Sequence, residues 1–255
     1  MKNTGNPTNP MFSLFKRKPT GGAAFEGLGC DMHSHLIPGI DDGAPDLQTS
    51  IQLIRGLQSL GYRKLITTPH INADTYQNTP AIIRQGQAVV EAELQKQNID
   101  VEFRAAAEYL LDEGFTRALS NGEPFLTIKD NLLLIELSFI VPLLNLKEIL
   151  FELQLKGYQP VLAHPERYLY FAANKGWYEQ LRDAGCLFQL NLLSFRGHYG
   201  KDAQQLAEWL VKKGYVELLG TDLHRAQHLA GLDSPKIEQR VRALLDTGRL
   251  LNPQL

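Results

Sequence analysis

Residues 30–70 read CDMHSHLIPGIDDGAPDLQTSIQLIRGLQSLGYRKLITTPH, and they contain one complete unit of the pattern that decides the fold. A short apolar run at 30–33 predicts a buried strand. Apolar residues then recur at helical spacing within 46–60, and Gly61 follows as a helix C-cap before the next apolar run, at 64–68. This stretch therefore predicts a strand, a helix and a second strand in succession.

The same alternation continues to the end of the chain, which closes with a helix at about 235–245. Seven runs are predicted to be strands: 30–33, 64–68, 101–108, 132–137, 160–163, 187–191 and 216–220. A doubly wound open sheet also has this alternation, but seven βα units in roughly 225 residues suit a closed barrel better. The predicted fold class is α/β, with a (β/α)7 TIM-like barrel.

Residues 1–29 contain Gly, Pro, Asn and a basic cluster but no sustained periodicity, which predicts a flexible lead-in. Residues 30–255 are then one domain, with no internal linker or low-complexity stretch. The chain has 26 Lys and Arg against 28 Asp and Glu, a net charge of -2 that argues against a nucleic-acid binder. Its apolar runs are too short for a membrane span, and its N-terminus lacks the features of a secretory signal. We expect a cytoplasmic protein.

Histidines and carboxylates follow the predicted strands at their carboxyl ends. Because these ends meet at one mouth of a parallel barrel, the side chains are expected to lie together. Imidazole and carboxylate groups are the usual ligands of divalent transition ions. The candidate metal ligands are His33, His35, Asp42, His70, Glu108, Glu136, His164, Asp222 and His224.

Two arginines adjoin these candidates. Arg167 lies three residues after His164, and Arg225 follows His224 directly, so either could bind phosphate with two parallel hydrogen bonds. For both, a surface ion pair is the alternative. Asp41 either binds metal or orients a ligand.

Other residues near the same mouth give weaker signals. Asp46 is expected to cap the helix that follows it. His198 is more consistent with an ordinary loop residue than with an acid for the leaving group. Tyr109, Tyr168 and Tyr170 either line an aromatic slot or pack on the barrel.

Six ordered motifs resemble those of the polymerase-and-histidinol-phosphatase (PHP) superfamily, and within it the bacterial manganese-dependent protein tyrosine phosphatases of capsule and exopolysaccharide operons. The resemblance covers about residues 30–250. The motifs are DMHSH at 31–35, PGIDDG at 38–43, TPH at 68–70, AEY at 107–109, AHPERY at 163–168 and GTDLH at 220–224.

This resemblance implies a distorted (β/α)7 barrel with up to three metal ions. It implies that His33, His35, Glu108 and Asp222 surround one ion, and that Glu108 also reaches a second ion with Glu136 and His164. It assigns Asp42, His70 and His224 to a third ion, and matches Arg167 to an arginine that binds substrate phosphate. Mn²⁺ is the expected ion, although the ligand types also suit Fe, Zn, Co or Mg.

The implied activity is hydrolysis of phosphotyrosine on a protein by a metal-bridging hydroxide, with the tail of a bacterial polysaccharide-synthesis tyrosine kinase as the expected substrate. Neither Cys30 nor Cys186 begins the Cys-x5-Arg loop of cysteine-based phosphatases. Two alternatives stay open: a small-molecule phosphatase, such as one for histidinol phosphate, and a non-catalytic regulator of the kinase.

Overall fold

The computed structural model describes residues 22–255. In this range the strands are β1 Cys30–Asp31, β2 Lys64–Thr67, β3 His70–Ile71, β4 Glu102–Ala105, β5 Glu108–Leu110, β6 Leu132–Glu136, β7 Gln159–Ala163, β8 Leu187–Asn191 and β9 Leu218–Gly220. The helices are α1 Gly22–Leu28, α2 Leu47–Leu60, α3 Pro80–Lys96, α4 Glu113–Asn121, α5 Leu146–Leu155, α6 Gly176–Asp183, α7 Lys201–Lys213, α8 Ala226–Leu232 and α9 Pro235–Leu245. Short 3-10 turns are η2 Pro165–Arg167, η3 Leu169–Phe171, η4 Leu192–Arg196 and η5 Asn252–Gln254.

The strands form parallel ladders in the order β1-β2-β4 and β3-β5-β6-β7-β8-β9. Two of the seven predicted strands differ in the structure. The run at 64–68 forms β2, and an additional strand that was not predicted, β3, begins after Pro69; the run at 101–108 is divided into β4 and β5. Hydrogen bonds from Ala106 N to the Thr67 oxygen and from Glu108 N to the Pro69 oxygen join the two ladders across the interruption. The distortion therefore arises where a proline removes a ladder donor.

The first and last strand runs meet and close the barrel. Ser34 forms a parallel bridge with Leu223, and His35 N donates to the Leu223 oxygen at 2.9 Å. Asp222 N donates to the His33 oxygen at 2.8 Å. An open doubly wound sheet has two free edges, so this pairing excludes it and confirms the distorted barrel.

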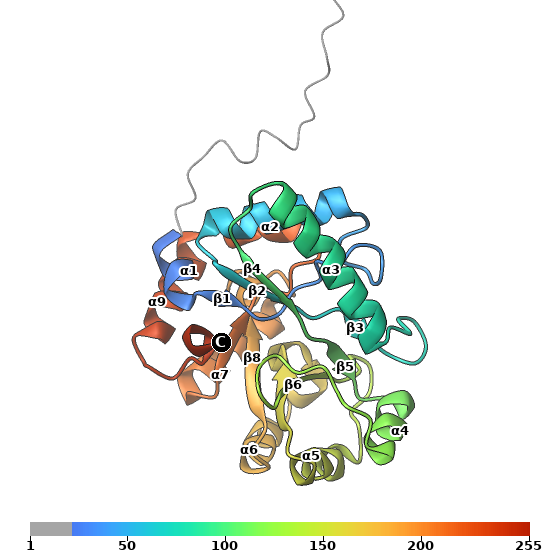
Figure 1. Ribbon diagram of the computed structural model, residues 1–255. Helices are drawn as coiled ribbons and strands as arrows, with labels where there is room; N and C mark the ends of the chain where they lie inside the picture. The colour runs from blue at the N-terminus through green and yellow to red at the C-terminus, as the bar shows by residue number, and fades with distance from the viewer. Residues whose placement is uncertain (1–21) are drawn as a thin grey trace, which may run out of the picture.

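The C-terminal turn η5 covers the starts of the strands, where Figure 1 shows the C-terminus close to β1. Asn252 Nδ2 donates to the backbone oxygens of Cys30 at 3.2 Å and Leu219 at 2.8 Å. Its Oδ1 accepts from Leu219 N at 2.9 Å. With this end covered, the carboxyl ends of the strands form the accessible mouth.

The predicted flexible lead-in at 1–29 is wrong for its last residues, because α1 is a helix that packs against α9. Phe25 and Leu28 are fully buried, and the Phe25 ring lies 5.4 Å from that of Tyr62. Burial of these apolar side chains outweighs the weak local helix signal. Residues 1–21, with the rest of that predicted lead-in, lie outside the described residues.

The helices surround the strands, with α2 and α3 on one side and α4, α5 and α6 on the other (Figure 1). Their termini follow the expected chemistry at α2: Asp46 accepts a hydrogen bond from Thr49 N at 2.7 Å, and Gly61 ends the helix at φ 117°. Within residues 22–255, none of the helices is long and apolar enough to span a bilayer.

Candidate metal centre

All nine candidate ligands converge at the mouth of the barrel. Their side-chain nitrogen and oxygen atoms form four overlapping groups, each with members within 4.8 Å of one another. The groups are His35, Asp42, His70 and His224; His33, His35 and Glu108; His33, His164 and Asp222; and His70, Glu108 and Glu136. The structure thus brings together residues that are up to 191 positions apart (33 to 224) in the sequence.

His33 and His35 follow β1 on one extended segment, so both imidazoles point to the same side. The Nε2 atoms of the two rings lie 3.4 Å apart. Asp222 Oδ1 lies 3.5 Å from each of these two nitrogens. Three donor atoms therefore face a common point, as the ligands of one ion do.

Glu108 lies at the start of β5 and presents its two oxygens to different imidazoles. Its Oε2 lies 3.2 Å from His33 Nε2, and its Oε1 lies 3.0 Å from His164 Nε2. Glu136, at the end of β6, places Oε1 3.5 Å from the same His164 nitrogen. The carboxylate of Glu108 therefore lies between two sets of donors, in the position of a bridging ligand.

His70 links the remaining donors. Its Nδ1 lies 3.2 Å from Glu108 Oε2, and its Nε2 lies 3.5 Å from Asp42 Oδ1. The same Asp42 oxygen is 3.5 Å from His224 Nε2. Asp42, His70 and His224 thus form the outer group, which is half-exposed at Asp42.

An unusual backbone conformation sets the direction of two of these side chains. His164 has φ 34° and Asp222 has φ 50°, both in the left-handed region. Such conformations are unfavourable for residues with a Cβ and tend to occur at functional sites. His164 directly follows β7, and Asp222 lies two residues after β9. At both positions the left-handed backbone directs the side chain to the centre of the mouth.

The carboxylates buried at this mouth favour the binding of cations. Glu108, Glu136 and Asp222 are buried together. Burial, and next the negative charge of the Glu108 carboxylate, raise the pKa of Glu136 well above its ordinary value. Burial and the neighbouring Arg167 lower the pKa of His164 to about 4, so its imidazole is neutral and able to bind a metal. The neighbouring carboxylates instead raise the pKa of His33 and His35. Clustered carboxylates and imidazoles fit divalent ions by donor type.

Residues outside the predicted set hold the ligands in place. Gln189 Oε1 accepts from His33 Nδ1 at 2.6 Å, and Gln189 Nε2 donates to Asn191 Oδ1 at 3.0 Å. Asn191 Nδ2 donates to Asp222 Oδ2 at 2.7 Å. Both amides lie on β8 two residues apart, so they share the face that points into the barrel. This polar alternation in FQLN is the signal that sequence reasoning missed.

Asp41 contacts the candidate ligand His35, which favours the orienting alternative for Asp41. Its Oδ2 accepts from His35 Nδ1 at 2.8 Å, and its Oδ1 accepts from Gly43 N at 3.0 Å. The His35 Nδ1–H is therefore engaged, which leaves Nε2 free to face the centre.

Arg167 projects from η2 into the same mouth. Its guanidinium carbon lies 4.3 Å from the Phe139 ring centroid and 4.5 Å from that of Tyr199. Nη1 donates to Asp222 Oδ2 at 3.1 Å, and the side chain is 25% exposed. The two rings hold the planar group in one orientation while part of it faces solvent.

A cavity of about 260 Å³ opens over the ligands and Arg167. Its lining includes Asp42, His70, Glu136, Phe139, His164, Arg167, His198, Tyr199, Asp222, His224, Arg225 and His228. Arg225 is exposed at this rim. A cavity with metal-type ligands on its floor and guanidinium groups at its side suits a phosphate ester.

A family model for capsular polysaccharide synthesis, CpsB/CapC, matches residues 29–245 of this chain. The chain belongs to the CpsB/CapC family. It is 30% identical over 198 residues to the tyrosine-protein phosphatase YwqE of Bacillus subtilis, covering 77% of this chain and 78% of YwqE. It is 26% identical over 203 residues to the tyrosine-protein phosphatase CpsB of Streptococcus pneumoniae, covering 76% and 82% respectively.

Solved structures agree with this CpsB/CapC assignment. The chain is similar, with a TM-score of 0.73 and 27% identity, to one described with YwqE from B. subtilis and CpsB from S. pneumoniae as metal-dependent tyrosine phosphatases. The match covers 85% of this chain and 94% of that one. Histidinol phosphate phosphatase from Lactococcus lactis is similar at a TM-score of 0.50 and 14% identity, over 83% of this chain and 92% of the other, which shows a shared fold alone.

The three tyrosines considered for an aromatic slot pack instead in this CpsB/CapC protein. Tyr109 and Tyr168 are buried, and their hydroxyls accept from Leu126 N at 2.8 Å and Leu137 N at 3.0 Å. The half-buried Tyr170 donates to the Ser138 oxygen at 2.9 Å. Phe139 and Tyr199 are the aromatic residues that line the site cavity, and neither was predicted to do so.

The remaining candidates differ in position. His198 lines the cavity, with its ring 5.0 Å from that of His228. Cys30 and Cys186 are both buried free thiols, and burial raises the pKa of Cys186 to about 12. Neither thiol has the character of a nucleophile.

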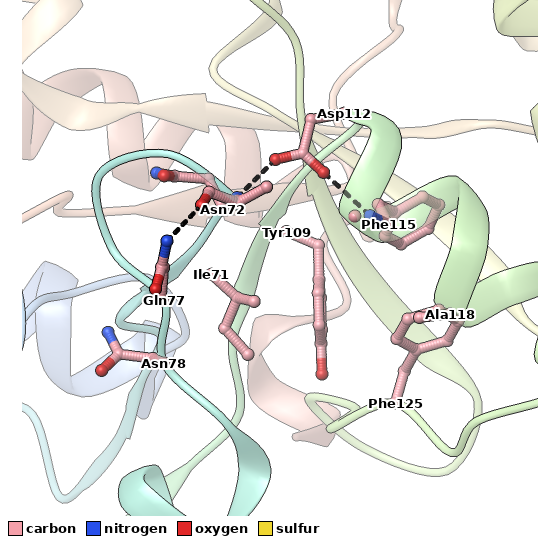
Figure 2. A pocket seen from close by; sticks show the side chains of 11 residues that line it. Ile71, Asn72, Gln77, Asn78, Tyr109, Asp112, Phe115, Ala118 and Phe125 are labelled. Carbon is pink, nitrogen blue, oxygen red and sulfur yellow. Dashed lines mark hydrogen bonds between the residues drawn. The ribbon is translucent and has the colours of Figure 1, made fainter.

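A second cavity, of about 300 Å³, lies behind the same strands and is shown in Figure 2. Ile71 and Tyr109 line it, and they directly follow the candidate ligands His70 and Glu108. Because alternate residues of a strand point to opposite faces, this cavity and the ligand cluster are on different sides of the sheet. Its lining is mainly apolar and contains no Lys or Arg, so it does not suit a phosphate.

Proposed function

We propose that this protein is a metal-dependent phosphatase that hydrolyses phosphotyrosine on proteins. The observation that carries the proposal is the position of the Arg167 guanidinium, which lies 3.1 Å from a candidate metal ligand and faces the same cavity. Family membership supports the choice of reaction, since the YwqE and CpsB relatives are named tyrosine-protein phosphatases.

We propose three ion positions that share ligands. His33, His35, Glu108 and Asp222 would hold the first ion, Glu108, Glu136 and His164 the second, and Asp42, His70 and His224 the third. The two-sided contacts of Glu108 support its role as a bridge. His35 also belongs to the outer group, so it lies between the first and third positions.

Divalent ions at these positions would lower the pKa of water and neutralise phosphate oxygens. The chain's own residues supply orientation. Gln189 and Asp41 fix the rings of His33 and His35. Arg167, in contact with the Phe139 and Tyr199 rings, would bind the non-bridging oxygens of the phosphate with charge-assisted hydrogen bonds. Arg225 at the rim would bind the phosphate or the chain beside it.

The proposal is tested by measuring the phosphate that the protein releases from candidate substrates. Protein stripped with a chelator would be supplied with Mn²⁺, Fe²⁺, Zn²⁺, Co²⁺ or Mg²⁺ in turn, and assayed on a phosphotyrosine peptide and on histidinol phosphate. We expect no turnover without metal, recovery with Mn²⁺, and a preference of about tenfold or more in kcat/KM for the peptide.

Other outcomes identify the alternatives. Full activity in verified metal-free protein would contradict the metal mechanism. A preference for histidinol phosphate would identify a small-molecule phosphatase. Peptide binding without turnover, whichever metal is added, would identify a regulator. We also propose that the ion is Mn²⁺, that the substrate is a polysaccharide-synthesis tyrosine kinase, and that the protein acts in the cytoplasm.

A further inference from the structure

Exposed apolar side chains are concentrated in residues 139–169, a segment whose first residue, Phe139, lines the cavity of the candidate site. Among the described residues, nine large hydrophobic side chains are exposed, and seven of them lie between residues 139 and 169. Those seven are Phe139, Ile140, Val141, Leu144, Phe151, Leu155 and Leu169. Single exposed apolar residues are ordinary, but a concentration of them marks a surface that another molecule covers.

The centre of this concentration is the segment 139–144, FIVPLL, here called the apolar loop. It joins β6 to α5. Ile140 is 87% exposed and Leu144 is 93% exposed, so these side chains have almost no contact with the rest of the protein. Such complete exposure of large apolar side chains is unfavourable, because their transfer out of water is favourable.

The apolar loop is continuous with the site cavity. Its first residue, Phe139, lines the cavity and stacks on the Arg167 guanidinium at 4.3 Å, yet 43% of it is exposed. The residues before it are fixed, since Leu137 N donates to the Tyr168 hydroxyl and the Ser138 oxygen accepts from Tyr170. From this fixed position at the edge of the cavity, the loop exposes Ile140, Val141 and Leu144, while Leu143 packs against the core.

Both apolar and polar residues line the cavity. Phe139, in the lining, is the first residue of the apolar loop, and Asp42, His198, Arg225 and His228 are among the polar lining residues. A polypeptide whose phosphotyrosine enters the cavity must cross its rim, and neighbouring residues along the polypeptide are about 3.5 Å apart. The residue next to the phosphotyrosine therefore lies near the edge of the cavity, where Phe139 begins the apolar loop.

We propose that the apolar loop binds large apolar or aromatic side chains that flank the phosphotyrosine of a protein substrate. This inference rests on the proposed function and specifies the class of phosphoprotein. Ile140, Val141 and Leu144 supply the contact surface, and Phe139 joins it to the position of the phosphate. The first turn of α5 contains both Lys147 and Glu148, and it lacks the basic surround that favours an anionic membrane.

Substrate discrimination provides the test. The probes are free phosphotyrosine, a phosphotyrosine peptide with Leu and Phe on either side, and the same peptide with Ser at those positions. The proteins, all loaded with metal, are the wild type, Ile140→Ser with Leu144→Ser, and a matched control, Ile82→Ser with Val89→Ser. The control residues are exposed apolar positions on α3 that are not among the residues lining the cavity.

We expect the wild type and the α3 control to prefer the Leu/Phe peptide to the Ser peptide by about tenfold in kcat/KM, mainly through KM. The loop variant should lose this preference to within about twofold, while all three proteins hydrolyse free phosphotyrosine equally.

Two outcomes would overturn the inference while leaving the proposed function intact. One is turnover without discrimination by the wild type, and the other is an undiminished preference in the loop variant. If that variant also loses a dimer in light scattering, or loses binding to phosphatidylglycerol vesicles, the loop serves self-association or a membrane instead. If none of the phosphotyrosine probes is hydrolysed by the wild type, the proposed function fails and this inference fails with it.

Discussion

Arg167 and Asp222 are joined by a hydrogen bond of 3.1 Å between Nη1 and Oδ2, although the two residues lie 55 positions apart in the sequence. The other oxygen of Asp222 faces His33 and His35. One carboxylate thus couples the guanidinium at the cavity wall to the group of imidazoles on its floor. Substitutions on the two sides of this contact should have separable effects.

Arg167→Lys should reduce kcat/KM by about tenfold or more, equivalent to at least about 1.4 kcal/mol, with little loss of bound metal. Lysine keeps the charge but lacks the planar fork that stacks between Phe139 and Tyr199. Steady-state kinetics with metal analysis on the same sample checks this. Unchanged kinetics would make Arg167 a surface residue, and lost metal would make it a support for the ligands.

Glu108→Gln should remove more than one metal ion per chain, because its two carboxylate oxygens face separate donor groups. We expect turnover to fall with metal content while the circular dichroism spectrum stays that of the wild type. Glu113→Gln, an exposed change on α4, is the matched control. Normal metal content in the Glu108 variant would disprove the bridging assignment.

Gln189→Ala should weaken metal binding by about 10- to 100-fold, since it removes the acceptor that fixes the His33 ring. Competition with a chromophoric chelator measures this affinity independently of activity. Gln180→Ala, at an exposed position on α6, should leave the affinity unchanged. Equal affinities in all three proteins would mean that the ring is held by packing alone.

Glu166→Gln should alter the pH dependence of stability. Glu166 is fully buried, and burial raises its pKa from 4.5 to about 7. Between these values the folded state keeps a proton that the unfolded state has lost, so the free energy of unfolding falls as pH rises. The glutamine variant lacks this titration and keeps an acceptor for Asn191 N and Ser194 Oγ.

The free energy of unfolding of the Glu166 variant minus that of the wild type should therefore increase by about 3 kcal/mol between pH 4.5 and 7, and then level off. Urea titrations at several pH values and constant metal concentration measure this difference. Glu148→Gln, an exposed change on α5, should give a flat difference. A flat difference for Glu166→Gln as well would mean that its carboxyl titrates normally.

The positions of most of these histidines and carboxylates were predictable because each follows an apolar run in the sequence. His70 and Glu108 differ from the prediction, since they begin β3 and β5 instead of ending strands. His33 and His35 share a face by strand periodicity alone, and parallel strands place their carboxyl ends together whatever the loops between them do. The helix of Asp46 and Gly61 is equally local, since its caps lie within a few residues of the groups they bond.

Contacts between distant segments required the tertiary structure. Three features depend on which surfaces meet in the folded chain. They are the interruptions between β2 and β3 and between β4 and β5, the docking of α1 on α9, and the contacts of Phe139 and Tyr199 with Arg167. Local periodicity in the sequence does not indicate such contacts. The choice between Asp41 and Asp42 is of the same kind: adjacent carboxylates have identical local signals, and only the position of His35 makes one its hydrogen-bond acceptor. Sequence thus determined which groups gather at the mouth of the barrel, and packing decided which of them face the centre and which hold the others in place.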